Sequence, residues 1–450
     1  MLVNIKRGKA VSKKVLIVSF NSPLSTLNIG SLRVRGLAKY LPEYNWEPAV
    51  LTVMSSGEPD ARFRVIQTPF PGTVQSNIKQ KLGLNPETPV GKQITFLKKI
   101  YSKEDFTILA KLAELFKTTL ADILAYPDHH KKWYPCALDE GIKLLSSESF
   151  DAVISSSPPP TCHLIARDLK RKFKIPWIAD FRDLWSLNPY MGFSTIRRII
   201  IDRYLEIKTL RLADALVTVS EPLAQELRTL HKGKPVYAIT NGFDPDEVKE
   251  KPISKEFTIT YTGNIYPGKR DPEPLFRAIS ELIAENQIKR ECVKIRFYGG
   301  WDYCFYCYHW VEKDIRKYNL EGVVSLYPKV PREIALDKQR ESQILLLLNW
   351  TDPKEPGIYT GKLFEYLAAK RPILAVGGPR GVVTELLEET GAGVHPLNYE
   401  ELKKVLLGFY NEYKTYGYVP YKGNEEKISK YSHREMARRF ADVLNTVTER

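Results

Sequence analysis

Short apolar runs alternate along the chain with longer stretches whose apolar residues recur at helical spacing. The apolar runs are short enough, and apolar enough, to be strands buried on both faces, as in parallel sheets. In the first half they predict strands at residues 14–18, 48–53, 152–154, 177–179, 215–219 and 236–239. The stretches between them, such as 33–41 and 163–172, keep an apolar stripe typical of a helix packed on a sheet. This alternation predicts an α/β domain.

The same pattern starts again after a polar, charged stretch at residues 245–255, which we interpret as a linker. Strands are predicted at 257–261, 293–297, 323–326, 344–348, 373–376 and 393–394, and a last polar helix at 432–446. We therefore predict three parts: an N-terminal Rossmann-like domain at 1–245, a C-terminal one at 256–425, and a helical segment at 426–450. The fold prediction is two Rossmann-like domains that face each other across a cleft, with the C-terminal helix returning to the N-terminal domain.

Length and composition indicate an ordinary globular protein. The chain has 450 residues, 43% of them hydrophobic, which predicts roughly two to four domains. Its longest uninterrupted apolar run, at 344–348, is far shorter than the ~20 residues of a membrane span. The run at 15–18 is also shorter than the core of a signal peptide. Five sparse cysteines favour a reducing compartment, so we expect a cytoplasmic protein.

The charge is strongly basic. Lys and Arg number 67 and Asp and Glu 53, for a net charge of +14. This excess suits nucleic acid, an anionic membrane or a polyanionic substrate. Because no zinc-finger or aromatic RNA-binding pattern accompanies it, we expect no nucleic-acid partner. Basic clusters lie among apolar residues at 79–81, 92–99, 131–132 and 197–198. They suit the inner face of an anionic membrane, and solvated helix faces are the alternative interpretation.

Residues 357–376 carry the most informative chemistry. A glycine-containing loop opens a predicted helix at Gly361, followed by Lys362 and Glu365 on one helix face. A helix N-terminus and a lysine suit phosphate, and a carboxylate suits sugar hydroxyls. Since the helix leads into a buried strand, the pattern predicts a site for a nucleotide-sugar.

Further cations and small residues follow predicted strands. Lys269 and Arg270 lie on a Pro-Gly turn after the strand at 257–261, and fixed cations there suit the leaving diphosphate of a glycosyl transfer. Asn28, Gly30 and Ser31 lie in the first strand-to-helix turn, where a backbone N–H can approach a diphosphate or an acceptor. A basic surface turn and an ordinary turn are the respective alternatives.

Asp180, Arg182 and Asp183 end a predicted strand and are the candidate catalytic residues. Either aspartate could orient or deprotonate an acceptor hydroxyl, and an Asp–Arg network bracing the loop is the alternative. His163 begins a helix in the same domain, where we interpret it as a capping or buried histidine.

No metal site and no cofactor are expected. Asp244 and Asp246 form an Asp-x-Asp pattern but follow a turn-forming Asn-Gly, so a hinge turn explains them better. Cys304 and Cys307 form an isolated CxxC, without the second half that a zinc site requires.

Six motifs together resemble the GT-B glycosyltransferases of the group 1 (family 4) retaining class. They lie in the same order as in that family, at residues 28–31, 179–183, 219–221, 241–244, 261–269 and 361–365. The resemblance implies that Gly263, Asn264 and Lys269 approach the donor diphosphate, with Lys362 as a further phosphate contact and Glu365 on the ribose diol. This sequence departs from the family pattern at Asn264, where an Arg is usual, and at Gly357, where a Glu is usual. Arg270 is the candidate to replace the missing Arg.

The resemblance implies a retaining, hexosyltransferase-like enzyme that moves a sugar from a nucleotide-sugar to a hydroxyl acceptor. The implied mechanism is front-face transfer, in which the leaving phosphate helps take the acceptor proton. We expect the acceptor to be a growing polysaccharide or a lipid-linked glycan. Two alternatives stay open at this point, a nucleotide-sugar epimerase of the same architecture and a non-catalytic scaffold.

Overall fold

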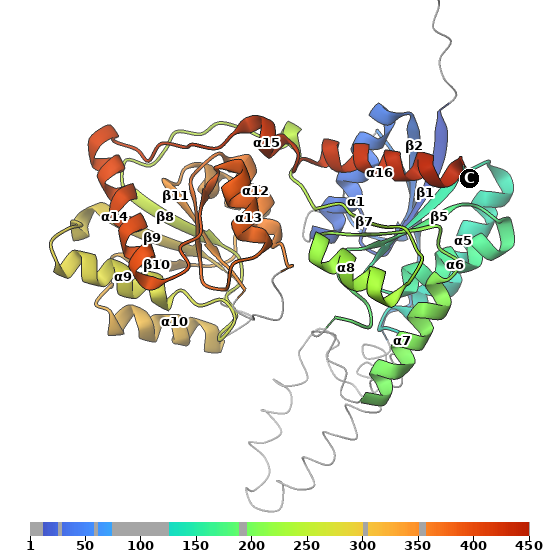
Figure 1. Cartoon of the computed structure of the whole chain (residues 1–450), viewed down its shortest axis with the longest axis horizontal. Coiled ribbons are helices and arrows are strands. Elements are labelled where there is room, and N and C mark those ends of the chain that lie inside the picture. The colour runs from blue at the N-terminus through green and yellow to red at the C-terminus, as the bar shows by residue number, and fades with distance from the viewer. Residues whose placement is uncertain are drawn as a thin grey trace, which may run out of the picture. The chain divides into compact units, whose positions relative to one another are not determined.

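The computed structural model of the chain describes residues 12–25, 29–57, 62–73, 126–188, 196–299, 305–350 and 357–449. The chain divides into two compact units (Figure 1). The first combines Met1–Ile239 with Ala437–Arg450, and the second is Thr240–Met436. Each unit is built on one parallel sheet, so the predicted fold class, two α/β domains, is confirmed.

The first unit contains a sheet of seven parallel strands in the order β3-β2-β1-β4-β5-β6-β7. The strands are β1 (Lys13–Ser19), β2 (Trp46–Val53), β3 (Arg64–Thr68), β4 (Ala152–Ser157), β5 (Trp177–Phe181), β6 (Ala215–Thr218) and β7 (Val236–Ala238). Central β1 pairs with β2 on one side and β4 on the other, so that Ile17 lies opposite both Val50 and Ile154. The strand order reverses between β1 and β4, where doubly wound sheets place their ligand crevice.

Helices and short 3-10 turns cover this sheet. They are α1 (Ile29–Tyr40), η1 (Leu41–Tyr44), η2 (Lys131–Trp133), α5 (Tyr134–Ser147), α6 (Thr161–Phe173), α7 (Ile196–Leu210), α8 (Glu221–Leu230) and α16 (His433–Thr448). From Ala437 onward α16 belongs to this unit, as the fold prediction anticipated. Its Asn445 accepts a hydrogen bond from the indole of Trp46 at 3.2 Å, and Arg439 donates to the carbonyl of Ala238 at 2.6 Å.

The second unit contains six parallel strands in the order β10-β9-β8-β11-β12-β13. They are β8 (Phe257–Thr262), β9 (Val293–Tyr298), β10 (Val324–Tyr327), β11 (Ile344–Leu348), β12 (Ile373–Val376) and β13 (Gly393–Val394). The helices are η3 (Pro245–Glu247), α9 (Glu273–Ala284), η4 (Arg290–Cys292), α10 (Phe305–Lys317), α11 (Arg332–Arg340), α12 (Gly361–Ala369), α13 (Val382–Thr390), α14 (Tyr399–Tyr416) and α15 (Glu425–Ser429). Here the order reverses between β8 and β11.

Strand β8 separates two kinds of packing in the second unit. Phe257, Ile259 and Tyr261 point into an apolar core with α9, α10 and α14. Thr258, Thr260 and Thr262 alternate with them and are equally buried, because the end of α11 packs on that face. The period-2 alternation of a strand thus supplies both a core face and a polar anchoring face.

One strand was missed by the sequence pattern. Strand β3, with the sequence Arg-Val-Ile-Gln-Thr, is not among the strands that the apolar runs predict. It is an edge strand of its sheet, and an edge strand with one solvated face can keep polar residues that hide the apolar signal. Apolar residues at helical spacing also predict a helix at 109–123, a segment that lies outside the described residues. No described helix combines the length and the apolar character needed to cross a bilayer.

Candidate functional site

The carboxyl ends of β8 and β11 bring together most of the predicted donor-binding residues of the second unit. Gly263 follows β8 directly and has a φ of +123°, a conformation that favours glycine. A Cβ atom at this position would lie 2.1 Å from Cε of Lys362, the second residue of α12. The Lys362 side chain therefore lies directly over the Gly263 backbone, and a larger residue at position 263 would displace it.

Aromatic rings support the cations at this edge. The Lys362 Nζ lies 5.2 Å from the ring centre of Tyr261, and the Lys269 Nζ 4.9 Å from that of Trp350. The guanidinium of Arg270 lies 5.3 Å from the ring centre of Trp350 and the same distance from that of Tyr266. Cations against aromatic faces are stabilised by the ring quadrupole.

Lys362 is held in an environment that disfavours its charge. Burial, reinforced by the positive charge of Arg270, lowers the pKa of Lys362 to about 7, although Glu365 acts in the opposite direction. An anionic ligand at this position would restore the proton and gain a second positive charge beside Arg270.

Helix α11 holds the carboxylate of Glu365. The buried Gln339 donates from Nε2 to Glu365 Oε2 at 3.2 Å and to Thr262 Oγ1 at 2.9 Å. Arg332, on the first turn of α11, places Nε 3.7 Å from Glu365 Oε1 and donates to Glu247 at 2.9 Å. Two residues of one helix thus orient the carboxylate that the sequence assigns to a ribose.

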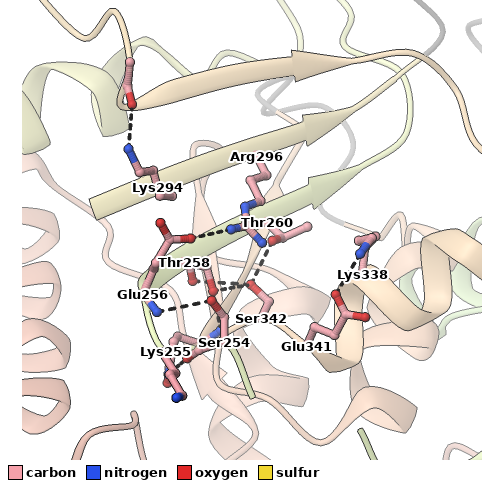
Figure 2. Close-up of polar contacts among 12 residues, drawn as sticks. Ser254, Lys255, Glu256, Thr258, Thr260, Lys294, Arg296, Lys338, Glu341 and Ser342 are labelled. Atoms are coloured by element: carbon pink, nitrogen blue, oxygen red, sulfur yellow. Dashed lines mark hydrogen bonds and ion pairs between the residues drawn. The ribbon is translucent and has the colours of Figure 1, made fainter. Parts of the chain in front are cut away.

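The end of α11 is itself anchored to β8 (Figure 2). The Ser342 hydroxyl lies 2.8 Å from Thr260 Oγ1, and the Gln343 backbone N–H donates to Thr258 Oγ1 at 2.9 Å. Figure 2 also shows the flanking ion pairs Arg296–Glu256 and Lys338–Glu341. These contacts set the position of α11 on the sheet, and therefore that of Gln339 relative to Glu365.

The other predicted donor residues lie around this cluster. Asn264 is exposed, and its carbonyl accepts a hydrogen bond from the Tyr261 hydroxyl at 2.7 Å. Gly361 opens α12, directly after Thr360. The Gly263 N–H donates to the Tyr298 carbonyl at 2.7 Å, so this N–H is already used within the sheet.

In the first unit, Asp180 forms a buried ion pair with Arg33 of α1. Arg33 Nη2 donates to Asp180 Oδ1 at 2.8 Å and Nε to Oδ2 at 3.1 Å, and the Ser156 hydroxyl donates to Oδ2 at 2.8 Å. Both side chains are 1% exposed. This arrangement corresponds to the bracing alternative, with Arg33 as the partner of the carboxylate.

Arg182 and Gly30 meet at the carboxyl ends of β4 and β5. Arg182 donates from Nε to the Ser157 carbonyl at 2.9 Å and from Nη2 to the Pro158 carbonyl at 2.5 Å. A Cβ on Gly30 would lie 1.3 Å from Nη1 of Arg182, so a side chain at position 30 would displace the Arg182 guanidinium. Asp183 follows with an exposed side chain, and Ser31 is buried in α1. Asn28 lies outside the described residues.

The residues that the sequence set aside behave as structural elements. His163 is buried, with Nδ1 2.7 Å from the Ser155 hydroxyl, and burial lowers its pKa to about 3. Asp244 accepts a hydrogen bond from the Asp246 N–H at 3.0 Å, which confirms a turn there. Cys307 is disulfide-bonded, which the expectation of a reducing compartment did not predict. Within the described ranges, no group of three or more His, Cys, Asp or Glu side chains is arranged to hold a metal.

Comparison with known proteins shows which family and which solved structures this chain resembles. Residues 111–247 match the family model described as Glycosyltransferase Family 4. The resemblance to the group 1 (family 4) glycosyltransferases is thereby confirmed. A comparison with curated proteins found no match.

Solved GT-B structures share the fold over almost the whole chain. Sucrose-phosphate synthase from Thermosynechococcus elongatus superposes with a TM-score of 0.64 at 12% identity, covering 97% of this chain and 99% of that one. HepE of Anabaena, solved in complex with UDP, gives 0.60 at 11% identity, with 96% and 100% covered. A glycosyltransferase from Rickettsia africae gives 0.57 at 14% identity, with 97% and 98% covered. These identities are low, so the likeness establishes the fold.

Sequence reasoning missed three residues: Trp350 and Gln339 in the second unit, and Arg33 in the first. Trp350 follows an apolar strand next to the topological switch point, and this position was the signal that could have drawn attention to it. Gln339 and Arg33 carried no comparable signal, because their partners are far away in sequence.

Proposed function

We propose that the protein is a retaining glycosyltransferase that moves a sugar from a nucleotide-sugar to a hydroxyl acceptor. The family match and the fold support glycosyltransferase function. The observation that carries the proposal is the cation cluster at the carboxyl edge of the second sheet, where Lys362 crosses over Gly263 beside Arg270. Fixed cations at this edge suit the charge that develops on a leaving diphosphate.

The proposed donor site assigns one task to each group. Lys362, Arg270 and Lys269 contact the diphosphate, and Arg270 takes the place of the arginine that is usual at Asn264. Glu365, held by Gln339, accepts hydrogen bonds from the ribose diol. A uridine nucleotide is the first donor to test, because HepE was solved with UDP and with UDP-glucose.

The proposed reaction proceeds on the front face of the sugar. The leaving phosphate helps take the acceptor proton, Asp183 orients the acceptor hydroxyl, and Arg182 braces the loop through the carbonyls of Ser157 and Pro158. The proposal includes no resident metal, because Lys362 and Arg270 supply positive charge at the diphosphate. A chelator should therefore leave nucleotide binding unchanged.

The proposed acceptor is a growing polysaccharide or a lipid-linked glycan. The proposed location is the cytoplasm, at the inner face of an anionic membrane. The net charge of +14 supports this location.

The first test is a thermal-shift screen against UDP, GDP, ADP and their sugar conjugates. A nucleotide at about 100 times its dissociation constant should stabilise the protein by ~2.7 kcal/mol. The shift should be lost in Lys362→Met and in Gly263→Ala, whose new Cβ displaces the Lys362 side chain.

Matched controls separate the site from general damage. Lys414→Met removes an exposed lysine of α14 and should keep the full shift. Gly233→Ala introduces a side chain at a φ of +80° with no atom within 4 Å, so it should lower stability and leave the nucleotide shift intact. Binding without transfer to any acceptor would favour the scaffold, and isomerised nucleotide-sugar would favour the epimerase.

A further inference from the structure

Helix α7 of the first unit exposes a stripe of apolar side chains. Ile200 is 63% exposed, Tyr204 65%, and Ile207 43%, and Ile201 beside them is 48% exposed. Positions 200, 204 and 207 follow one another at the spacing of a single helix face. Figure 1 shows α7 running along the outside of its unit.

Both acidic residues between positions 198 and 211 point the other way. Asp202 is fully buried and accepts a hydrogen bond from Arg198 Nε at 2.6 Å. Glu206 is fully buried, accepts from the Ser186 N–H at 2.8 Å, and lies 3.1 Å from His231 Nε2. The polar contacts that hold the helix therefore lie on its inner side, an inversion of the usual surface helix.

The cations of this stretch surround the apolar stripe. Arg203, Lys208 and Arg211 are exposed, and the Lys208 Nζ lies 5.7 Å from the ring of Tyr204. Lys234 adds a further cation at the end of the helix, where it donates to the Arg211 carbonyl at 2.7 Å. Arg198, which the sequence placed in a membrane-facing basic cluster, is instead turned inward. The exposed positive charge comes instead from cations further along the helix, Arg203 and Lys208.

We infer that the outer face of α7 docks on an anionic lipid bilayer. This docking face consists of Ile200, Ile201, Tyr204, Ile207, Arg203 and Lys208 of α7, together with Arg211, which directly follows the helix. Isoleucines and a tyrosine enter the boundary between headgroups and acyl chains, while the flanking cations pair with lipid phosphates. The docking face combines exposed apolar side chains with cations and has no acidic residue. It is therefore complementary to a surface that is negatively charged and partly apolar.

This inference deepens the proposed function. The biological use of lipid docking rests on that function, whereas the docking itself does not. A lipid-linked acceptor would lie at the same bilayer surface. The hydrogen bond from Ser186 to Glu206 joins α7 to the loop that begins with Arg182 and Asp183. The docking helix is thus bonded directly to the segment that carries the candidate catalytic aspartate.

The test is flotation of the full-length protein with vesicles of phosphatidylcholine, with and without phosphatidylglycerol, in the absence of any nucleotide. Wild type should float with the anionic vesicles at low salt and be released at high salt. Ile200→Ser with Tyr204→Ser, and separately Arg203→Glu with Lys208→Glu, should each weaken binding about tenfold. Equal binding to neutral vesicles, or no binding by wild type, overturns the inference.

Controls distinguish binding through the docking face from nonspecific effects of exposed charge and exposed apolar side chains. Lys313→Glu with Lys414→Glu reverses two exposed lysines of the second unit, and Tyr416→Ser with Tyr418→Ser removes two exposed tyrosines. Both controls should bind vesicles as wild type does. If light scattering instead shows a dimer that dissociates only in the α7 variants, the docking face is an interface with a second copy of the chain. The inference then fails. UDP binding is measured on the same samples, so failure of the donor proposal remains separate from failure of lipid docking.

Discussion

The surroundings of Lys362 disfavour the protonated form of its amine, and this property distinguishes the candidate site. Its pKa of about 7 results from burial and from the neighbouring charge of Arg270. Because an anion beside Lys362 favours its protonated form, this site can discriminate between a phosphorylated and an unphosphorylated ligand. Gly263 makes this arrangement possible, since any Cβ there would occupy the path of the lysine side chain.

This low pKa predicts a pH-dependent affinity for the donor. Below about pH 7 the amine is already protonated, whereas above it binding must take up a proton, so affinity should fall up to about tenfold per pH unit. Calorimetry with UDP-glucose between about pH 6 and 9 measures this, and the number of protons taken up follows from buffers of different ionisation enthalpy. Lys362→Arg, whose side chain keeps its charge, should flatten the profile. A flat profile in wild type would contradict the assignment of Lys362 to the diphosphate.

At the scale of elements, α11 acts as a support for α12. Ser342 and Gln343 bond the end of α11 to the threonines of β8. Gln339 of the same helix then orients Glu365 through a hydrogen bond. Gln339 is a positioning residue in this arrangement, because it acts on the ligand only through the carboxylate that it orients.

Replacing Gln339 by Met should remove this orientation while keeping the buried volume. Loss of a hydrogen bond worth about 1 kcal/mol predicts about fivefold weaker binding of UDP. Pyrophosphate, which has no ribose, should bind unchanged, and calorimetry with both ligands separates positioning from general damage. Gln343→Met is the matched control, because Gln343 is equally buried but bonds to Ser254 and Val419. Equal losses for both ligands would indicate a purely structural role.

At the scale of the whole molecule, the last helix completes a unit whose other residues come more than 190 positions earlier. Phe440 of α16 is fully buried, and the guanidinium of Arg33 lies 5.3 Å from its ring. The first unit is therefore not complete until α16 has been synthesised, although the second unit is contiguous in sequence.

Phe440→Ala should destabilise the first unit selectively, by about 3–5 kcal/mol, because it empties a buried aromatic site. Hydrogen exchange should show faster exchange in β1, β2 and α1, with β8 and β11 protected as in wild type. Thr446→Ala, at an exposed position of the same helix, should leave both units unchanged. Loss of protection in both units would mean that the chain unfolds as one body.

Prediction from sequence succeeded where the determining interactions are local. Lys362 and Glu365 lie three residues apart on one helix, so their common face follows from helix geometry alone. The apolar runs predicted most of the strands, and the polar edge strand β3 escaped for lack of such a run. The Arg33–Asp180 pair could not be found in this way, because its members are 147 positions apart and no local pattern links Arg33 to Asp180.

The sequence by itself determined the α/β class, the two sheets and the cations that follow their strands, because these depend on hydrophobic period and on short turns. Only the tertiary structure decided which aspartate is buried in an ion pair, which helix supports Glu365, and which side of α7 faces outward. Helical periodicity shows that a helix has two faces, but packing selects the inner one. In α7 the bonds of Asp202 and Glu206 made that selection and left the isoleucines outside.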